Sequence, residues 1–361
     1  MLKPPIPQRR SASRLCTYCL LLIAALCTPL SQVEARPPGA DPLFADPDPL
    51  SITLTGPFSE INRKRDKEQE YAGTLSYANE DGETTVLDVK YSVRGNFRLQ
   101  NKVCSYAQLW INLKKSQVKD TLFHKQNKLK LVVQCRDSER FREFIAREEH
   151  AYRMFQTLSD ISLGTRLLEV NYVDTAGDDD SRTQTAFFIQ HQKRLAKQLD
   201  MDVLDLPSAD KARLDEPQSA LVALFMYMVS NTDYSMIASP PGQNCCHNTK
   251  VLAASTGALY PVPYDFDSTG YVNASYAEPS GDLKQRSVRQ RIYRGFCVSD
   301  EAQDRALAIM REKRASIYRI LEDNRYLKDK SVKKSRKFID DFYSVIDDPR
   351  DLQYAVIGKC R

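Results

Sequence analysis

The order of the elements that the sequence predicts is the strongest constraint on the fold. Residues 50–195 are mostly strand-like with one long helix, whereas helices dominate residues 196–361. Residues 217–230 (PQSALVALFMYMVS) are apolar nearly all round, which is typical of a helix buried on every side. Two further stretches, 302–321 and 332–346, have the spacing of amphipathic helices. The sequence therefore predicts an α+β protein with a strand-rich first part and a helical second part.

The strand-rich part is expected to contain one helix over residues 137–158. Asp137 or Ser138 can cap it, and apolar side chains recur at helical spacing from Phe141 to Phe155. A turn at residues 80–83 is expected to join two strands. Further strands, rich in β-branched and aromatic residues, are predicted at 51–54, 108–113, 128–135, 167–173 and 185–190.

The N-terminus has the order of segments found in a secretory signal peptide. Arg9, Arg10 and Arg14 precede an apolar run over residues 15–30, and small residues near Ala35 offer a cleavage site. The run is shorter than the roughly 20 residues that a membrane-spanning helix needs. We therefore expect residues 1–35 to be a signal peptide, with a Pro- and Asp-rich linker at 36–49. The mature chain is then exported to the periplasm or beyond, without an integral membrane segment.

The charge distribution argues against nucleic acid as a partner. The formal net charge is +5, and it falls to +2 once the four basic and one acidic residues of the first 35 are removed. Basic and acidic side chains alternate along most of the chain. A nucleic-acid-binding domain usually concentrates its basic residues on one face, so we interpret these charges as a solvated surface.

Six cysteines follow residue 35, and an even number in an exported chain indicates disulfides. We expect Cys104 to pair with Cys135, and the two adjacent cysteines at 245 and 246 to pair with those at 297 and 360. No C-x-x-C motif of the kind that binds zinc is present. A zinc site at Cys245-Cys246-His247 would need a distant fourth partner, and it stays open as an alternative. The six residues are Cys104, Cys135, Cys245, Cys246, Cys297 and Cys360.

A lysine in one of the predicted strands is a candidate site residue. Side chains alternate between the faces of a strand, so in residues 128–133 three apolar side chains share one face. Lys130 and Val132 share the other face, which is therefore expected to adjoin something polar. An ordinary solvent-facing lysine is the alternative.

A glutamate on the predicted helix is the expected partner of this lysine. Glu148 lies four residues after Phe144 and four before Tyr152, inside the apolar stripe. A carboxylate facing the protein body needs a partner, whereas Glu149 is expected to be exposed. A strand lysine followed by an inward helix glutamate is the arrangement with which kinases hold nucleotide phosphates. A structural Lys130–Glu148 ion pair without a ligand stays the alternative.

The second part of the chain supplies an ordered set of polar residues. Asp233 directly follows the buried helix, and Asn248 precedes a predicted hairpin over residues 249–263. Asp265 and Asp267 follow in the stretch YDFD. Phosphoryl transfer needs one carboxylate to orient the attacking hydroxyl, and an asparagine and another carboxylate to hold magnesium. Singly, each of these residues fits a turn or a helix cap equally well.

These motifs carry a resemblance to a known group. The segments LKLVVQC, REEHAYRMF, SNTDYS, CCHNTKVL and PVPYDFDSTGYVN resemble exported bacterial proteins that are similar to CotH-type and, more remotely, HipA-type atypical kinases. The resemblance covers nearly all of the mature chain, and its C-terminal motifs are the more specific. It implies a two-lobed protein-kinase-like fold, with a strand-rich N-lobe at 50–195 and a helical C-lobe at 196–361. It also implies ATP and Mg²⁺ as cofactors.

The resemblance assigns a role to each candidate residue. Lys130 corresponds to the strand lysine that contacts phosphate, and Glu148 to its helix partner. Asp233 corresponds to the catalytic-loop aspartate. The residues that correspond to metal ligands are Asn248, Asp265 and, as a second acid, Asp267.

The sequence also departs from the kinase pattern. The catalytic asparagine of kinases follows its aspartate by about five residues, whereas Asn248 follows Asp233 by fifteen, with the insertion at 240–242 and a cysteine pair between them. No GxGxxG loop is present; residues 94–96 (RGN) are the nearest candidate and resemble the RGN stretch of CotH-like proteins.

Three functions follow as hypotheses. The first is an exported kinase that transfers phosphate from Mg-ATP to a hydroxyl of a protein or envelope acceptor. The second is a pseudokinase-like binding or envelope protein, and the third is a hydrolase that uses Asp265 and Asp267 as paired carboxylates.

Overall fold

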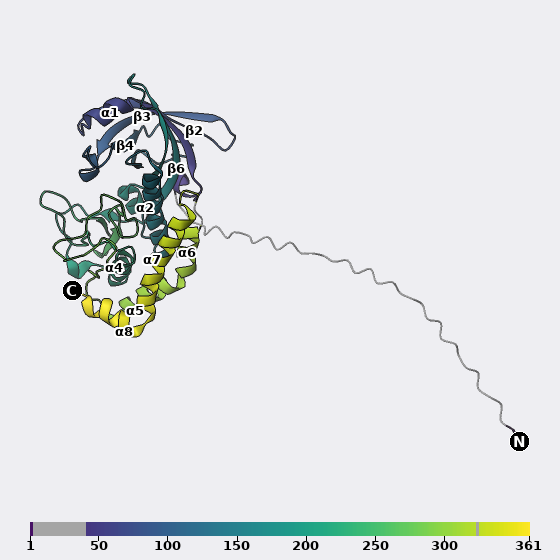
Figure 1. Ribbon diagram of the computed structural model, residues 1–361, viewed down its shortest axis with the longest axis vertical. Coiled ribbons are helices and arrows are strands. Elements are labelled where there is room, and N and C mark those ends of the chain that lie inside the picture. Colours follow the sequence, from purple (N-terminus) through teal and green to yellow (C-terminus); the bar gives the residue numbers. More distant parts are fainter. Residues whose placement is uncertain (3–40, 323–324) are drawn as a thin grey trace. The chain divides into compact units, whose positions relative to one another are not determined.

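The computed structural model describes residues 1–2, 41–322 and 325–361 (Figure 1). The described chain from residue 41 onward belongs to one compact unit. Residues 3–35 of the signal peptide predicted at 1–35 lie outside the described residues, as do residues 36–40 of the predicted linker.

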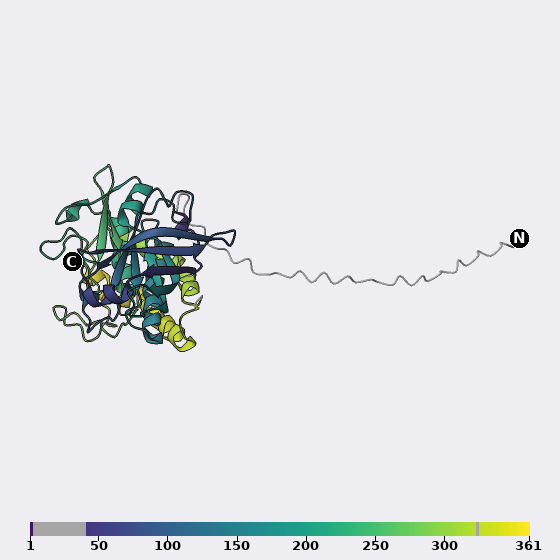
Figure 2. The ribbon, with the colours of Figure 1, turned by 90° about the horizontal axis from the view of Figure 1, so that it is seen from above.

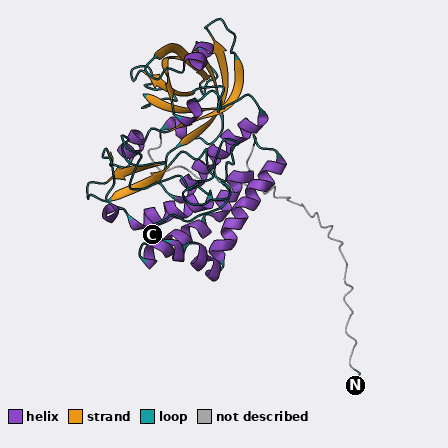
Figure 3. Cartoon of the chain, turned by 60° about the vertical axis from the view of Figure 1, so that its left-hand side comes forward, coloured by secondary structure: helices purple, strands orange, loops and turns teal. Residues whose placement is uncertain are grey.

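Seven strands form the main sheet, and this sheet closes into a barrel (Figure 3). Their order around the barrel is β1-β2-β3-β4-β5-β7-β6. Neighbours are antiparallel except β1 and β6, whose parallel pairing closes the barrel. The strands are β1 (Leu50–Gly56), β2 (Glu70–Ala78), β3 (Thr84–Arg94), β4 (Gln108–Leu113), β5 (Lys128–Val133), β6 (Thr165–Asp174) and β7 (Arg182–Ile189).

The predicted two-lobed kinase-like fold is therefore wrong. The resemblance implied an N-lobe of strands and one helix, but the parallel pairing of β1 with β6 turns the seven strands into a closed barrel. A closed barrel has no free sheet edge and fills its interior with its own side chains. Most strand and helix positions were predicted correctly, whereas the closure of the barrel was not.

Alternation along the strands gives the barrel its own apolar core. Leu129, Leu131 and Val133 of β5 point into it, as the sequence predicted. Tyr91 of β3 is fully buried, and its hydroxyl donates to the carbonyl of Thr74, 2.7 Å away. Close packing here requires glycine, since a Cβ at residue 73 would lie 2.4 Å from the Tyr91 ring.

The long helix α2 (Glu139–Leu158) covers the outside of the barrel and belongs to a second, larger core. It packs against β6 and β7 on one side and against α6 on the other (Figure 1). Its position matches the predicted helix at 137–158, with Ser138 as the N-cap residue. Because one helix contacts both the barrel and the helical part, the two parts share a continuous packing surface.

The helical part surrounds α4 (Glu216–Met228), which is buried all round as predicted. Asp215 caps this helix by accepting a hydrogen bond from the Gln218 N–H, 2.9 Å away. The barrel lies at one end of the unit, α6 packs beside α2 and α7 beside α6, and Figure 2 looks onto the barrel end. The predicted helix at 302–321 is divided at Lys313. The last four helices are α5 (Asp300–Glu312), α6 (Arg314–Glu322), α7 (Asp329–Asp347) and α8 (Pro349–Ala355).

Smaller elements connect these parts. The predicted hairpin at 249–263 is confirmed as two antiparallel strands, and a short third strand pairs with it. The described end of the expected linker packs on the body, since Phe44 is buried and Asp41 forms a 2.6 Å ion pair with Arg194. The remaining elements are α1 (Phe58–Lys64), α3 (Gln192–Gln198), β8 (Asp202–Val203), β9 (Thr249–Ala253) and β10 (Leu259–Pro263).

The six cysteines form three pairs, of which one was predicted. Cys104 pairs with Cys135, as expected. The adjacent residues Cys245 and Cys246 pair with each other. The prediction that they reach residues 297 and 360 is wrong, because the last residues of the chain lie beside Cys297 and bring Cys360 to it. None of the helices in the described ranges has the length and apolar character of a membrane span.

Candidate functional site

Five charged side chains from distant segments meet in one buried place, which we call the polar cluster. Arg98 lies at its centre, with Nη1 3.3 Å from Glu148 Oε2 and Nε 3.1 Å from Asp267 Oδ2. Arg98 Nη2 is also 3.8 Å from Asp265 Oδ1. Lys130 Nζ lies 3.9 Å from the same Asp265 oxygen. The cluster thus contains four of the predicted site residues and one that the sequence did not single out.

Lys130 enters the cluster from the outer face of β5. Its neighbour two residues on, Val132, packs in the second core, so this face points toward α2 and away from the barrel interior. The amine also lies 4.7 Å from the ring centre of Tyr264. Burial lowers the pKa of Lys130 to about 8, although the negative charge of Asp265 opposes this effect. The prediction that this strand face adjoins polar groups is confirmed.

Glu148 faces inward from α2, as predicted, but its partner is different. The side chain is buried and pairs with Arg98 rather than with Lys130. Burial raises the pKa of Glu148 to about 7, and Arg98 counteracts part of this rise. The expectation that Glu149 is exposed is wrong, because it is equally buried and accepts a hydrogen bond from the Thr165 hydroxyl, 2.9 Å away.

Arg98 is the residue that the sequence reasoning missed. It lies in a single turn of 3-10 helix directly after the RGN stretch, at the end of β3. Arg94 of that stretch is also buried, and it donates to the carbonyl oxygens of Leu109 (3.1 Å) and Leu131 (3.0 Å) at the barrel rim. One feature of the sequence could have identified Arg98: it is a second arginine, four residues after Arg94, and it lies just after the RGN stretch that was the nearest candidate for a phosphate-binding loop.

An aromatic anchor places the two aspartates of the YDFD stretch. Phe266 is fully buried, with its ring centre 4.6 Å from that of Tyr152 and 5.5 Å from that of Phe225. The Asp265 backbone N–H donates to the Tyr152 hydroxyl oxygen, 2.8 Å away. Burial alone would raise the pKa of Asp265, but Lys130 and the arginines outweigh burial and hold it low. Burial raises the pKa of Asp267, despite its contact with Arg98.

A second group forms around Asp233 in the loop after α4. Asp233 Oδ1 lies 2.9 Å from His247 Nε2, and Asn248 Nδ2 donates to Asp233 Oδ2 (3.2 Å) and to its carbonyl oxygen (2.6 Å). The hydrogen bond with His247 lowers the pKa of Asp233 and raises that of His247. The carboxylate is thus fixed at both oxygens, while about two thirds of its side chain stays exposed (66%).

The second group adjoins the polar cluster. The Tyr264 N–H donates to the Asn248 carbonyl oxygen, 3.2 Å away, so Asn248 lies beside the segment that carries Asp265. The charge of Asp265 also acts on Asp233, whose pKa it pushes upward. The structure therefore brings Lys130, Glu148, Asp233, Asn248, Asp265 and Asp267 into one neighbourhood, although the fold around them is not the predicted one.

The neighbourhood offers few ligands for a bare metal ion. Within residues 41–322 and 325–361, no three His, Cys, Asp or Glu side chains are arranged to hold one. Cys245 and Cys246 are joined to each other, so their sulfurs are not available as thiolate ligands for the zinc alternative. The oxygen-bearing groups that suit magnesium are the Asn248 amide and the Asp265 carboxylate.

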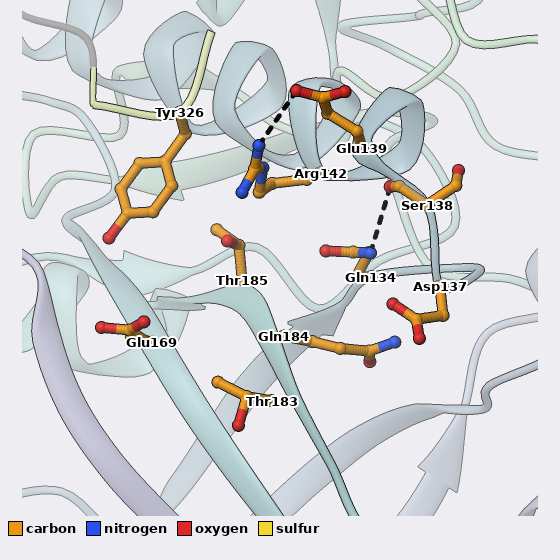
Figure 4. Close-up of a pocket in the computed structure, with 10 residues that line it drawn as sticks. All are labelled: Gln134, Asp137, Ser138, Glu139, Arg142, Glu169, Thr183, Gln184, Thr185 and Tyr326. Carbon is orange, nitrogen blue, oxygen red and sulfur yellow. Dashed lines mark hydrogen bonds and ion pairs between the residues drawn. The ribbon is translucent and has the colours of Figure 1, made fainter.

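A separate cavity of about 270 Å³ opens at the first turn of α2, beside β6 and β7 (Figure 4). No member of the polar cluster lines it. Figure 4 shows that some of its polar groups pair with each other, since Arg142 contacts Glu139 (3.4 Å) and the Gln134 amide donates to the Ser138 carbonyl (3.3 Å). Its lining residues are Gln134, Asp137, Ser138, Glu139, Arg142, Glu169, Thr183, Gln184, Thr185 and Tyr326.

No known protein family, curated protein or solved structure matches the chain.

Proposed function

We propose that this protein is a phosphotransferase that moves a phosphoryl group from a magnesium–nucleotide, such as Mg-ATP, to a hydroxyl acceptor. The observation that carries the proposal is the link between the polar cluster and the Asp233 group: Asn248, which holds Asp233, accepts a hydrogen bond from the Tyr264 N–H, one residue before Asp265. Cations that suit phosphate and an ionised carboxylate that suits a hydroxyl thus belong to one neighbourhood.

The charge balance of the polar cluster favours a nucleotide complex over a free metal ion. Glu148, Asp265 and Asp267 are opposed by Lys130 and Arg98, with Arg94 close by. Three acids against three cations leave no excess negative charge to attract a bare Mg²⁺. A nucleotide brings its own phosphate charge, so its phosphates would meet the cations while Asp265 and Asn248 hold the accompanying Mg²⁺.

Lys130 is the most suitable phosphate contact. Its amine lies 3.9 Å from Asp265, at the outer limit of an ion pair, and it is only partly neutralised there. A nearby phosphate oxygen would offer a stronger partner, because hydrogen bonds between an ammonium and an anion are short and strong. Arg98 is held by Glu148 and Asp267 and would stay in place as a fixed positive charge.

Asp233 is the group suited to the acceptor hydroxyl. Its two oxygens are held by His247 and Asn248, yet its side chain is exposed enough to be reached from outside. Orienting a hydroxyl toward a phosphoryl group requires a carboxylate in a fixed position, with an oxygen within about 2.6–3.2 Å of the hydroxyl oxygen whose proton it accepts.

The test is transfer of labelled phosphate from ATP by the purified protein in the presence of Mg²⁺. Lys130→Met should remove phosphate binding and Asp233→Asn should remove hydroxyl orientation, so each is expected to lower the rate at least about 100-fold. Lys90→Met is the matched control, because it breaks an exposed pair with Glu70 far from the site. Unchanged transfer in both site variants would contradict the proposal.

A nucleotide-binding protein without catalysis is the second candidate. Two observations favour it: the fifteen-residue interval between Asp233 and Asn248, and the partial neutralisation of Lys130 by Asp265. This protein would show a rise in melting temperature with Mg-ATP, since a ligand of the native state stabilises it by mass action, but no transfer. A rise that Lys130→Met abolishes, without phosphate transfer in the wild type, would decide for this candidate.

A further inference from the structure

Basic side chains border the loop that carries Asp233. Segment 275–297 contains five basic and two acidic residues, and it packs against the loop at residues 230–232. Four cations are relevant here and form what we call the basic rim: Lys284, Arg286, Arg294 and Arg361.

Hydrogen bonds fix the first pair of the rim next to Asp233. The Thr232 hydroxyl donates to Gln285 Oε1, 3.1 Å away, and Gln285 is the residue between Lys284 and Arg286. Gln285 itself is buried and its amide donates to the Gln290 carbonyl oxygen (2.8 Å). Lys284 and Arg286 are both exposed, and they flank a buried residue that is hydrogen-bonded to Thr232, next to Asp233.

The second pair is connected to the same residue through its backbone carbonyl oxygen. Arg294 Nη1 donates to the Thr232 carbonyl oxygen, and Arg361 Nε donates to the Arg294 carbonyl oxygen, 3.1 Å away. Arg294 also lies close enough to Asp233 to stabilise its negative charge. Arg294 thus lies beside the carboxylate that would receive the acceptor, and Arg361 is held next to Arg294.

Apart from the influence of Asp233 on Arg294, no acidic side chain in the described ranges pairs with a cation of the rim. In the described ranges, none of the four forms an ion pair within 4.0 Å, and the two acids of the segment, Glu278 and Asp282, pair with none of them. Unneutralised cations grouped around a site raise the local concentration of anionic ligands and reject cationic ones.

We propose that the basic rim binds the acceptor, and that the acceptor is an acidic protein segment with a hydroxyl residue flanked by Asp or Glu. This inference rests on the proposed function, because it names the acceptor of the same site. The rim is connected to Thr232 both through the Thr232 side chain and through its carbonyl oxygen, so an acidic segment that reaches Asp233 would find several cations close by. Arginine is suited to such carboxylates through paired hydrogen bonds.

The spacing of the cations favours a peptide over a polyanion. In residues 284–294 (KQRSVRQRIYR) the basic side chains alternate with polar and apolar ones. Segments that bind nucleic acid or other polyanions are typically contiguous basic runs or broad basic faces. Separate cations fit individual carboxylates better than a continuous line of phosphates.

The first experiment measures binding without nucleotide. A labelled peptide with one serine between Asp and Glu residues is titrated with the purified protein by fluorescence anisotropy, next to a matched peptide with Asn and Gln. We expect at least about 10-fold tighter binding of the acidic peptide at low salt, and a loss of this preference at high salt. Equal binding of the two peptides would overturn the proposal, as would equally tight binding of polyphosphate.

Charge reversal then tests whether the acidic peptide binds at the basic rim. Lys284→Glu with Arg286→Glu should weaken binding of the acidic peptide at least about 10-fold. Lys115→Glu with Lys119→Glu, between β4 and β5 of the barrel, changes the net charge equally at exposed positions and should alter binding less than about 2-fold. Equal melting temperatures would establish that both double variants fold. A rim variant that binds as tightly as the wild type overturns the assignment.

The outcomes separate this inference from the proposed function. Preferential binding of the acidic peptide without any phosphate transfer would support peptide binding at the basic rim and refute the phosphotransferase. Transfer to the neutral peptide at the same rate as to the acidic one would support the phosphotransferase and refute the role of the basic rim in binding the acceptor.

Discussion

Replacing Arg98 by Met is the most direct test of the polar cluster. The substitution keeps much of the side-chain volume but removes the cation that Glu148 and Asp267 contact at 3.3 and 3.1 Å. Both acids are buried, at 2% and 9% exposure, so they would lose their main counter-charge without gaining water. Removing one partner of a buried ion pair costs about 3–5 kcal/mol of unfolding free energy, and we expect a loss in this range.

Urea unfolding measures this loss, with the fluorescence of the single tryptophan, Trp110, as a probe. Trp110 pairs with Lys130 across β4 and β5, so its signal reports on the barrel next to the cluster. Lys90→Met is the control, because an exposed ion pair contributes about 0–1 kcal/mol.

A rescue variant makes the test specific. Adding Glu148→Gln and Asp267→Asn to Arg98→Met removes the unpaired charges and should recover more than half of the lost stability. A loss below about 1 kcal/mol in Arg98→Met would refute the buried cluster. A loss that the neutral amides do not relieve would attribute the effect to packing instead of charge.

Three further predictions concern stability. Burial lowers the pKa of His150 to about 3, so the neutral side chain contributes its full stability above the unfolded pKa of about 6.5, and this contribution is lost as the pH falls toward 3. Between pH 7 and pH 4.5 the wild type should therefore lose about 2.5–3 kcal/mol of unfolding free energy that His150→Gln does not lose, as measured by urea unfolding at the two pH values. Gly73→Ala places a methyl group 2.4 Å from the Tyr91 ring and should lower the melting temperature by at least about 5 °C; an unchanged value would contradict the packing of the barrel core. Replacing Cys297 and Cys360 by Ser opens a loop of 63 residues and should cost about 4 kcal/mol of unfolding free energy in urea. The reduced wild type, which also loses Cys104–Cys135 and Cys245–Cys246, should lose at least as much, and an unchanged stability in the double Ser variant would contradict this prediction.

The sequence predicted local structure well because local patterns determine it. Strand alternation identified the outward position of Lys130, and the apolar stripe of α2 identified the inward position of Glu148. The barrel closure depends on the pairing of β1 with β6, which are more than 100 residues apart. No periodicity within either strand specifies its partner. The sequence patterns therefore did not contradict the kinase-like fold that the resemblance implied.

The sequence predicted most residues of the site, but not which of them contact each other. The sequence could place an acid after α4 and two acids after the hairpin, but it assigned Glu148 to the wrong cation. Arg98 comes from an irregular turn, where no periodicity shows the direction of a side chain. The cysteine pairs differ for a similar reason, since only the fold places Cys360 beside Cys297.

The closing strand of the barrel has a consequence for the time course of folding. β1 is the first strand in the chain, and its register with β6 runs from Leu50 opposite Leu168 to Gly56 opposite Asp174. During synthesis the chain can pair β1 with β2 early, but the other edge of β1 stays open until about residue 174 has emerged. An open edge of this kind invites pairing with other chains. Any holding factor that acts on the nascent protein would therefore be needed most during the interval between these two strands.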